Sequence, residues 1–517
     1  MPTLFATKRL LLVQLPGTEV PSGTLDVNFD GHRVWSTPVR WAAGPGIGVA
    51  WPRALRPYLR GRTHLSVTSS STGEEIASGE VKFGGHGRVS VTDARGRWLS
   101  VNKWDRLGHT LDSDDSGGVQ ERLLDNGAAL AAQLQEWGYP VYAVGGTLLG
   151  ALRTGELMPH DDDIDFAWLC EETSMADVSL ASYEMERRLT ALGHVVVRHS
   201  LAHLQVTYFT DDGRTDHYID IFTGFHTDDG LYNQPFALRG ELAKETLVPT
   251  STIEIGGRTL PAPAEPEAWL EFAYGPSWLV PDPSFKFVTP QSTLRLFETH
   301  LGVYNRQRVW WEKHYEEIDV RDPSVPSEAD AADVDRFLER VPAGAPVTEL
   351  GCGDGRLTER IAAAGHPVRA YDYSHEGLRI ARTALQTRPG LRSRIEYDYL
   401  NTNDRHGVIT LALDLLDKGE EVWFFAGSML HDVPQNGRES IYLLLRAVLN
   451  DHTCGYFTFY ADPHPHRDPQ VPETWHLPLS ALHEETRRFG LSFHSLGSTK
   501  VRTPYGTRAK QTVIMWR

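Results

Sequence analysis

The sequence has few cysteines, no long apolar stretch, and fewer basic than acidic residues. Its three cysteines, Cys170, Cys352 and Cys454, lack CxxC spacing. They indicate neither a disulfide framework nor a zinc site, and they fit a reducing cytoplasm. The first apolar run covers only residues 10–13, which is too short for a signal-peptide core, and no later run approaches membrane-spanning length. We therefore expect a cytoplasmic protein, which could also work at the inner face of a membrane.

Acidic side chains outnumber basic ones by 68 to 51, which gives a formal net charge of −17. A general nucleic-acid binder needs basic surface against the phosphate backbone, so this balance predicts no nucleic-acid partner. A small basic pocket for one nucleotide is still compatible with it. The length of 517 residues predicts two to four domains, each with its own core.

The most informative stretch covers residues 144–168 and reads VGGTLLGALRTGELMPHDDDIDFAW. Gly145, Gly146 and Thr147 form a turn that leads into a short apolar helix at residues 148–152. The free backbone N–H groups at such a helix start are suited to hold phosphate. We therefore predict that these three residues bind a phosphate group of the substrate.

An acidic run follows the turn and continues into a segment of high β-propensity. Alternation along a strand places Asp163 and Asp165 on one face, with Asp161 at the strand entrance, while Ile164 and Phe166 face the other way. Carboxylates this close repel one another unless a cation lies between them, and such oxygen ligands suit Mg²⁺ that bridges to a phosphate. The alternative is a solvated acidic loop.

These residues resemble the LicD/fukutin family of phosphotransferases, a branch of the nucleotidyltransferase fold. The resemblance covers residues 119–291 and includes GTLLGALRTGELMPHDDDIDF, then HYIDIF at 217–222 and EAWLEFAYGPSWLVP at 267–281. It implies transfer of a phospho-alcohol, such as phosphocholine, glycerol phosphate or ribitol phosphate, from a CDP-linked donor to an acceptor hydroxyl. His160 replaces the large aromatic residue that often precedes the acidic run in the family.

The resemblance also implies a further acidic residue on the later strand, here Asp220. Its neighbours in the sequence are Ile219 and Ile221, and a carboxylate buried between them needs a partner. A Mg²⁺ or Mn²⁺ ion shared with Asp163 and Asp165 would supply one. The alternative is an aspartate that local N–H groups or an arginine satisfy.

The expected chemistry assigns roles to the charged residues around this metal site. The cation offsets charge on the reacting phosphate and on the CMP that leaves. Asp220 or Asp161 is a candidate base for the acceptor hydroxyl. Arg153 and Lys286 are candidate phosphate partners, with ordinary surface charge as the alternative.

Residues 1–110 alternate short β-prone runs with turns, which predicts an all-β sandwich or barrel as an accessory domain. The region shows no catalytic cluster. Its tryptophans favour core packing over a sugar-stacking surface. They are Trp35, Trp41, Trp51, Trp98 and Trp104. We expect the central α/β domain to follow at residues 118–320.

A third domain is expected at residues 327–517, after a polar linker that contains prolines. Strand-like residues 347–350 lead into a turn with Gly351, Gly353 and Gly355, and a helix follows at 357–364. A second strand ends at Asp372, twenty-one positions after Gly351. This order indicates a Rossmann-like α/β fold in which glycines let the backbone approach a nucleotide and the aspartate accepts ribose hydroxyls.

The ELGCGDG run resembles the first motif of class I methyltransferases, and the resemblance covers nearly all of this domain. It implies S-adenosylmethionine (SAM) held by Glu349, Gly351, Gly353 and Asp372, with Asp398 at the adenine. His431 lies where the acceptor would face the methyl group, as a candidate catalytic base. The alternative for His431 is a structural histidine at a strand end.

Together these features predict a bifunctional enzyme that adds a phospho-alcohol to a glycan, teichoic-type polymer or lipid-linked carrier and methylates the product. Two alternatives are open. The central domain could transfer a nucleotidyl group to make an activated precursor, with release of pyrophosphate instead of CMP. One of the two domains could also be a catalytically silent binding module.

Overall fold

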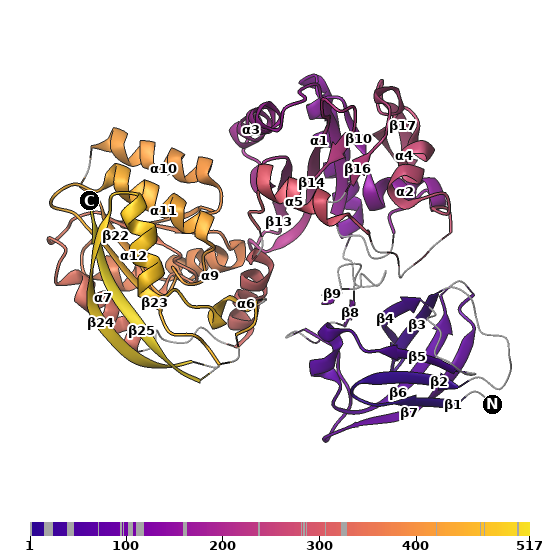
Figure 1. Cartoon of the computed structure of the whole chain (residues 1–517), viewed down its shortest axis with the longest axis horizontal. Coiled ribbons are helices and arrows are strands. Elements are labelled where there is room, and N and C mark those ends of the chain that lie inside the picture. Colours follow the sequence, from indigo (N-terminus) through magenta and orange to yellow (C-terminus); the bar gives the residue numbers. More distant parts are fainter. Residues whose placement is uncertain are drawn as a thin grey trace. The chain divides into compact units, whose positions relative to one another are not determined.

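The computed structural model describes most of the chain (Figure 1). The described residues are 3–14, 24–38, 46–70, 72–93, 96, 98–101, 107–109, 118–158, 163–235, 238–280, 282, 285, 287–305, 307–321, 328–419, 421–465, 467–469, 471–503 and 506–517. They form two compact units. The first unit ends at Leu301, and the second comprises Gly302–Arg517 with the short segments Arg198–Ser200 and Phe209–Asp216. None of the described helices is long and apolar enough to span a membrane.

The N-terminal region consists of antiparallel strands, as the sequence predicts. Three strands pair in the order β1-β2-β5 and four in the order β4-β3-β6-β7, and both sheets contribute to one core. Trp35 and Trp51 are buried in that core and Trp98 stacks on His32, so these three tryptophans pack internally. Trp41 and Trp104 lie outside the described residues. The strands are β1 (Thr3–Ala6), β2 (Leu10–Gln14), β3 (Thr24–Phe29), β4 (His32–Pro38), β5 (Gly46–Ala50), β6 (Gly61–Ser69), β7 (Glu75–Gly84), β8 (Leu99–Val101) and β9 (Leu107–His109).

The central region is a mixed sheet with helices packed against it (Figure 1). Its strands run in the order β10-β11-β14-β13-β12, and β15 and β16 extend it from β14. The strands are β10 (Val141–Ala143), β11 (Asp163–Cys170), β12 (Val195–Ser200), β13 (His203–Phe209), β14 (Thr215–His226), β15 (Tyr232–Gln234), β16 (Leu238–Gly240) and the hairpin β17 (Ser251–Ile255) and β18 (Arg258–Ala262). The helices are α1 (Val119–Glu136), α2 (Gly145–Thr154), α3 (Met175–Ala191), α4 (Pro266–Tyr274) and α5 (Gln291–His300).

The C-terminal unit is a seven-stranded sheet in the order β21-β20-β19-β22-β23-β25-β24. The first five of these strands are parallel, and β25 pairs antiparallel with both β23 and β24. The chain order reverses between β19 and β22, and a ligand crevice is expected at the carboxyl ends of strands where such a reversal occurs. This topology confirms the α/β Rossmann-like fold expected from the glycine-rich turn.

The elements of this unit cover both faces of the sheet (Figure 1). The helices are α6 (Arg308–Arg321), α7 (Glu328–Leu338), α8 (Arg356–Ala363), α9 (His375–Gln386), α10 (Arg405–Lys418), α11 (Gln435–Val448) and α12 (Leu479–Arg488). The strands are β19 (Val347–Leu350), β20 (Val368–Asp372), β21 (Ile395–Tyr399), β22 (Trp423–Ala426), β23 (Gly455–Tyr460), β24 (Ser492–Thr503) and β25 (Gly506–Trp516). The sequence did not predict α6, α10 or the long β24–β25 hairpin.

Helix α1 packs directly behind the acidic strand through a glycine. The helix is continuous from Val119 to Glu136, although Asn126 and Gly127 have low helix propensity. Asn126 Nδ2 lies 3.0 Å from His217 Nε2, and a Cβ added at Gly127 would lie 2.5 Å from Ile164 Cδ1. The glycine therefore lets α1 approach β11 at the residue between Asp163 and Asp165.

We predict that Gly127→Ala destabilises the protein by about 1 kcal/mol, because overpacking against buried Ile164 outweighs the helix propensity of alanine. In an Ile164→Val background, which lacks Cδ1, the same substitution should stabilise by about 1 kcal/mol. Urea unfolding of the four proteins of this double-mutant cycle measures both effects. Equal effects of Gly127→Ala in the two backgrounds would contradict the proposed contact.

Candidate functional site

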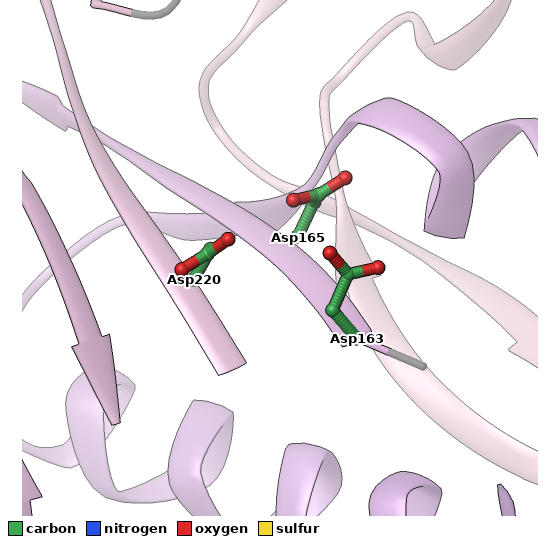
Figure 2. Close-up of side chains that lie close together, drawn as sticks. All are labelled: Asp163, Asp165 and Asp220. Atoms are coloured by element: carbon green, nitrogen blue, oxygen red, sulfur yellow. The ribbon is translucent and has the colours of Figure 1, made fainter. Parts of the chain in front are cut away.

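Three aspartates of the central sheet point into one small space (Figure 2). Strands β11 and β14 pair in parallel with Asp165 opposite Asp220, and Asp163 is on the same face of β11 as Asp165. One carboxylate oxygen from each of the three lies within 4.8 Å of the others. Asp220 is buried, whereas Asp163 and Asp165 are half-buried. Such a group of oxygens fits a divalent cation, since hard oxygen ligands are what Mg²⁺ and Mn²⁺ bind.

The glycine turn lies against this cluster, as the sequence predicts. Helix α2 begins at Gly145, directly after β10, and the Gly146 N–H lies 3.4 Å from Asp165 Oδ2. Thr147 Oγ1 accepts the backbone N–H of Asp165 at 2.9 Å. Gly145 has φ +60°, and a Cβ added there would overlap Asp165 Oδ2. The start of α2 and the acidic strand therefore form one site, in which backbone N–H groups and carboxylates are neighbours.

Three further residues were predicted to act at this site, and the described part of the chain includes one of them. Asp161 and Lys286 lie outside the described residues, so their predicted roles remain predictions. Arg153 donates from Nε to the carbonyl of Trp278 at 2.8 Å and from a terminal nitrogen to the carbonyl of Val280 at 3.2 Å. In this structure Arg153 holds the segment after α4 in place, and its role as a phosphate partner stays a prediction.

A second candidate site is a cavity of about 370 Å³ in the C-terminal unit, at the carboxyl ends of β19, β20 and β22. Gly351 and Gly353 line it with φ values of +72° and +54°, which favour glycine. Asp372 accepts the Gly353 N–H at Oδ2 and the Ser374 N–H at Oδ1, both at 2.8 Å. Burial raises the pKa of Asp372 to about 6, although both hydrogen bonds oppose the shift. The glycine turn and this carboxylate lie together as predicted.

Three predicted cofactor residues do not line the cavity. Glu349 is buried below the turn, where its Oε2 accepts Thr358 Oγ1 at 2.5 Å. Gly355 begins α8 with φ +80°, and a Cβ there would overlap Tyr397 Oη, so this glycine serves packing. Asp398 is exposed on β21, and its Oδ1 accepts the N–H of Tyr399. The assignment of Asp398 to the adenine stays a prediction, although alternation along β21 turns its side chain to solvent and it does not line this cavity.

The sequence missed several lining residues that come from other elements. Helix α6 contributes an aromatic group, and the loop after β21 contributes polar atoms where Asp398 was expected. Glu312 of α6 accepts Ser374 Oγ at 2.7 Å and the N–H groups of His375 and Glu376 at 3.0 and 2.9 Å, which fastens α6 to the start of α9. The missed lining residues are Trp311, His314, Tyr315, Tyr373, Leu400, Thr402 and Asn403.

His431 lines the same cavity, as expected for a candidate base. Its Nε2 lies 3.1 Å from Asp432 Oδ1, and its Nδ1 has no hydrogen-bond partner among the described residues. Burial lowers the pKa of His431 well below its ordinary value, and the charge of Arg508 acts in the same direction. Burial also raises the pKa of Asp432 well above its ordinary range. The imidazole is therefore neutral at pH 7, and its surroundings disfavour the protonated form.

Comparison with known proteins gives matches to two kinds of enzyme. Residues 138–265 match the family model described as LicD/FKTN/FKRP, nucleotidyltransferase domain. A ubiquinone biosynthesis O-methyltransferase from Xylella fastidiosa is 36% identical over 92 residues, which are 17% of this chain and 32% of that protein. Its mitochondrial counterpart from Schizosaccharomyces pombe is 28% identical over 111 residues, or 20% of this chain and 40% of that protein. The chain thus spans about a third of the first of these curated relatives and two fifths of the second.

Solved structures also resemble part of the chain. A SAM-dependent methyltransferase from Anabaena variabilis covers 40% of this chain and 93% of its own, with 18% identity and a TM-score of 0.31. One from Methanosarcina mazei covers 35% of this chain and 95% of its own, with 19% identity and a TM-score of 0.29. The family model and the curated relatives confirm the two resemblances read from the sequence, a LicD-type region and a methyltransferase-type region in one chain.

We predict that Gly145→Ala weakens Mn²⁺ binding about tenfold or more, because the added Cβ displaces the carboxylate of Asp165. The matched control is Gly155→Ala at the other end of α2. Gly155 also has a positive φ, +75°, but has nothing within 4 Å of an added Cβ. Titration with Mn²⁺ followed by electron paramagnetic resonance compares the two variants. Equal loss of affinity in both would attribute the effect to backbone strain instead of the contact with Asp165.

We predict that stability depends on pH through the buried Glu349. Burial raises the pKa of its carboxyl from 4.5 to about 8. The folded state therefore holds a proton that the unfolded state releases, so this carboxyl lowers stability as pH rises from about 4.5 to 8, by at most about 1.4 kcal/mol per pH unit. Glu349→Gln removes this term, so its Tm relative to wild type should rise from pH 5 to pH 8 in calorimetry. Glu396→Gln, at an exposed carboxyl, should show no such trend.

Proposed function

We propose that this protein is a bifunctional transferase that moves a phospho-alcohol from a CDP-linked donor to an acceptor hydroxyl and methylates the product with SAM. The observation that carries the first activity is the set of Asp163, Asp165 and Asp220, whose oxygens lie within 4.8 Å of one another beside the start of α2. This set falls within the segment that matches the LicD model. Glycerol phosphate, ribitol phosphate and phosphocholine are the candidate groups.

The first site suits phosphoryl transfer because it combines carboxylates with the backbone N–H groups of a helix start. A Mg²⁺ or Mn²⁺ ion held by the three aspartates would offset charge on the reacting phosphate and on the leaving CMP. The backbone N–H groups at the start of α2 then orient the donor phosphate. Asp220 is the candidate to accept the proton of the acceptor hydroxyl, together with Asp161, which would stand at the entrance of β11.

The second activity rests on the cavity at the ends of β19, β20 and β22. SAM fits this cavity, with Gly351 and Gly353 against its amino-acid portion and Asp372 at the ribose hydroxyls. SAM supplies an already activated methyl group, so the protein needs to position the acceptor and remove one proton. His431, which lines the cavity, is the candidate to accept this proton from an acceptor hydroxyl.

The acceptor that we propose is a glycan, a teichoic-type polymer or a lipid-linked carrier. Both activities on one chain favour consecutive steps on one product, in which methylation of the added unit or of the chain end stops growth. Work at the inner face of a membrane would bring the protein to a lipid-linked acceptor. The description of the matched family as a nucleotidyltransferase domain favours a second candidate, transfer of a nucleotidyl group to form an activated precursor.

We would test the first activity by incubating the protein with Mg²⁺, candidate glycan acceptors and CDP-glycerol, CDP-ribitol or CDP-choline. We expect CMP release that depends on the acceptor with one donor, and a loss of at least about 100-fold in Asp163→Asn. Addition of labelled SAM should then label the same product, and His431→Gln should lower labelling without lowering CMP release. Asp177→Asn, an exposed aspartate at the start of α3, is the control.

Other outcomes would decide among the alternatives. Release of pyrophosphate from a nucleoside triphosphate, with no CMP from any donor, would favour nucleotidyl transfer. Folded protein that binds SAM but releases neither product would make the central domain a binding module. Methyl label on an acceptor that carries no phospho-alcohol would contradict consecutive steps.

A further inference from the structure

Two polar side chains of β13 contact the buried aspartate of the acidic cluster. His203 Nε2 and Gln205 Nε2 both lie 3.2 Å from Asp220 Oδ1. The two residues stand two positions apart on β13, so they share one face of the sheet. Neither residue follows from the sequence motifs, and the function proposed above does not use them.

The position of β13 in the sheet indicates from which side His203 and Gln205 approach Asp220. Strand β14 lies between β11, which carries Asp163 and Asp165, and β13. His203 and Gln205 therefore approach Asp220 from the side opposite to the other two carboxylates. Figure 2 shows one oxygen of Asp220 turned toward Asp165 and the other turned away. Because β13 lies on the side of β14 away from β11, we infer that His203 and Gln205 contact the oxygen that is turned away, which leaves the other oxygen for the shared space.

The contact between His203 and Asp220 is held in place because both side chains are packed against their surroundings. The side chains of His203 and Asp220 are 8% and 12% exposed. The His203 ring stacks on Phe222, with 4.3 Å between ring centroids and 29° between planes. Phe222 stands two residues after Asp220 on β14, so one strand carries both the carboxylate and the ring that fixes its partner. The imidazole therefore has little freedom to leave the carboxylate.

We propose that His203 and Gln205 are positioning residues that hold Asp220 with one oxygen aimed at a divalent cation. This inference rests on the metal site of the proposed function. A ligating carboxylate commonly accepts further hydrogen bonds on its other oxygen, and loss of such partners typically lowers metal affinity about 10- to 100-fold. His203 is thus not itself a ligand. It acts through Asp220, and Gln205 supports the same oxygen with a neutral donor.

The test uses Mn²⁺ as a spectroscopic probe of the full-length protein. We expect the Kd for Mn²⁺ to rise about 10- to 100-fold in His203→Leu and less in Gln205→Leu. His203→Gln keeps a donor and should recover part of the affinity. Thr207→Val changes the next residue on the same face of β13 and should bind Mn²⁺ like wild type. Circular dichroism and Tm establish that each variant is folded.

Pulsed electron paramagnetic resonance tests separately whether His203 is itself a ligand of the metal. Bound Mn²⁺ should show no nitrogen coupling from an imidazole, because its ligands are carboxylates and water. Nitrogen coupling that disappears in His203→Gln would overturn the inference by making His203 a ligand. Unchanged affinity in folded His203→Leu and Gln205→Leu would overturn it by making the contact purely structural. Absence of Mn²⁺ binding by wild type would instead overturn the metal site of the proposed function, and the positioning role with it.

Discussion

The parallel pairing of β11 with β14 is the constraint on which the first site depends. Because the register sets Asp165 opposite Asp220, alternation along β11 also brings Asp163 to the same space. Three carboxylates at this separation would repel one another in a half-buried position, so the fold holds them against an electrostatic cost. Both supports of the cluster, the close approach of α1 through Gly127 and the start of α2 at Gly145, serve to keep this pairing in place.

The second site depends on a different constraint, the turn between β19 and α8. The positive φ values of Gly351 and Gly353 bring backbone N–H groups beside Asp372, and the side chain of Tyr315 closes over Gly353. The carboxylate of Glu312 then fastens α6 to the start of α9, where N–H groups would otherwise lack acceptors. A helix far from the glycine motif in sequence thus completes the wall of the cavity.

The sequence predicted the elements that carry local signals and missed those that depend on tertiary packing. Strand periodicity placed Asp163 and Asp165 on one face, and the glycine turn with Asp372 followed from spacing alone. Asp220 was predicted as a member of the site mainly through the resemblance to the LicD/fukutin family. Asp398 faces solvent because alternation along β21 turns it outward, and Glu349 lies below the turn because a motif position does not state which way a side chain points. His203, Gln205 and α6 contribute through the register of neighbouring strands and the docking of a helix, which no local pattern records.

The two sites use the same residue type in opposite ways. Asp163, Asp165 and Asp220 converge on one another, so their charge is best offset by a cation, as the proposed transfer of a phospho-alcohol requires. Asp372 instead accepts two backbone N–H groups, which offset part of the cost of burying its charge, and its remaining acceptor capacity suits neutral hydroxyls. A divalent cation would therefore gather at the first cluster and gain little at the second. One chain can hold both transfer chemistries because the backbone, and not a metal, satisfies the carboxylate of the second site.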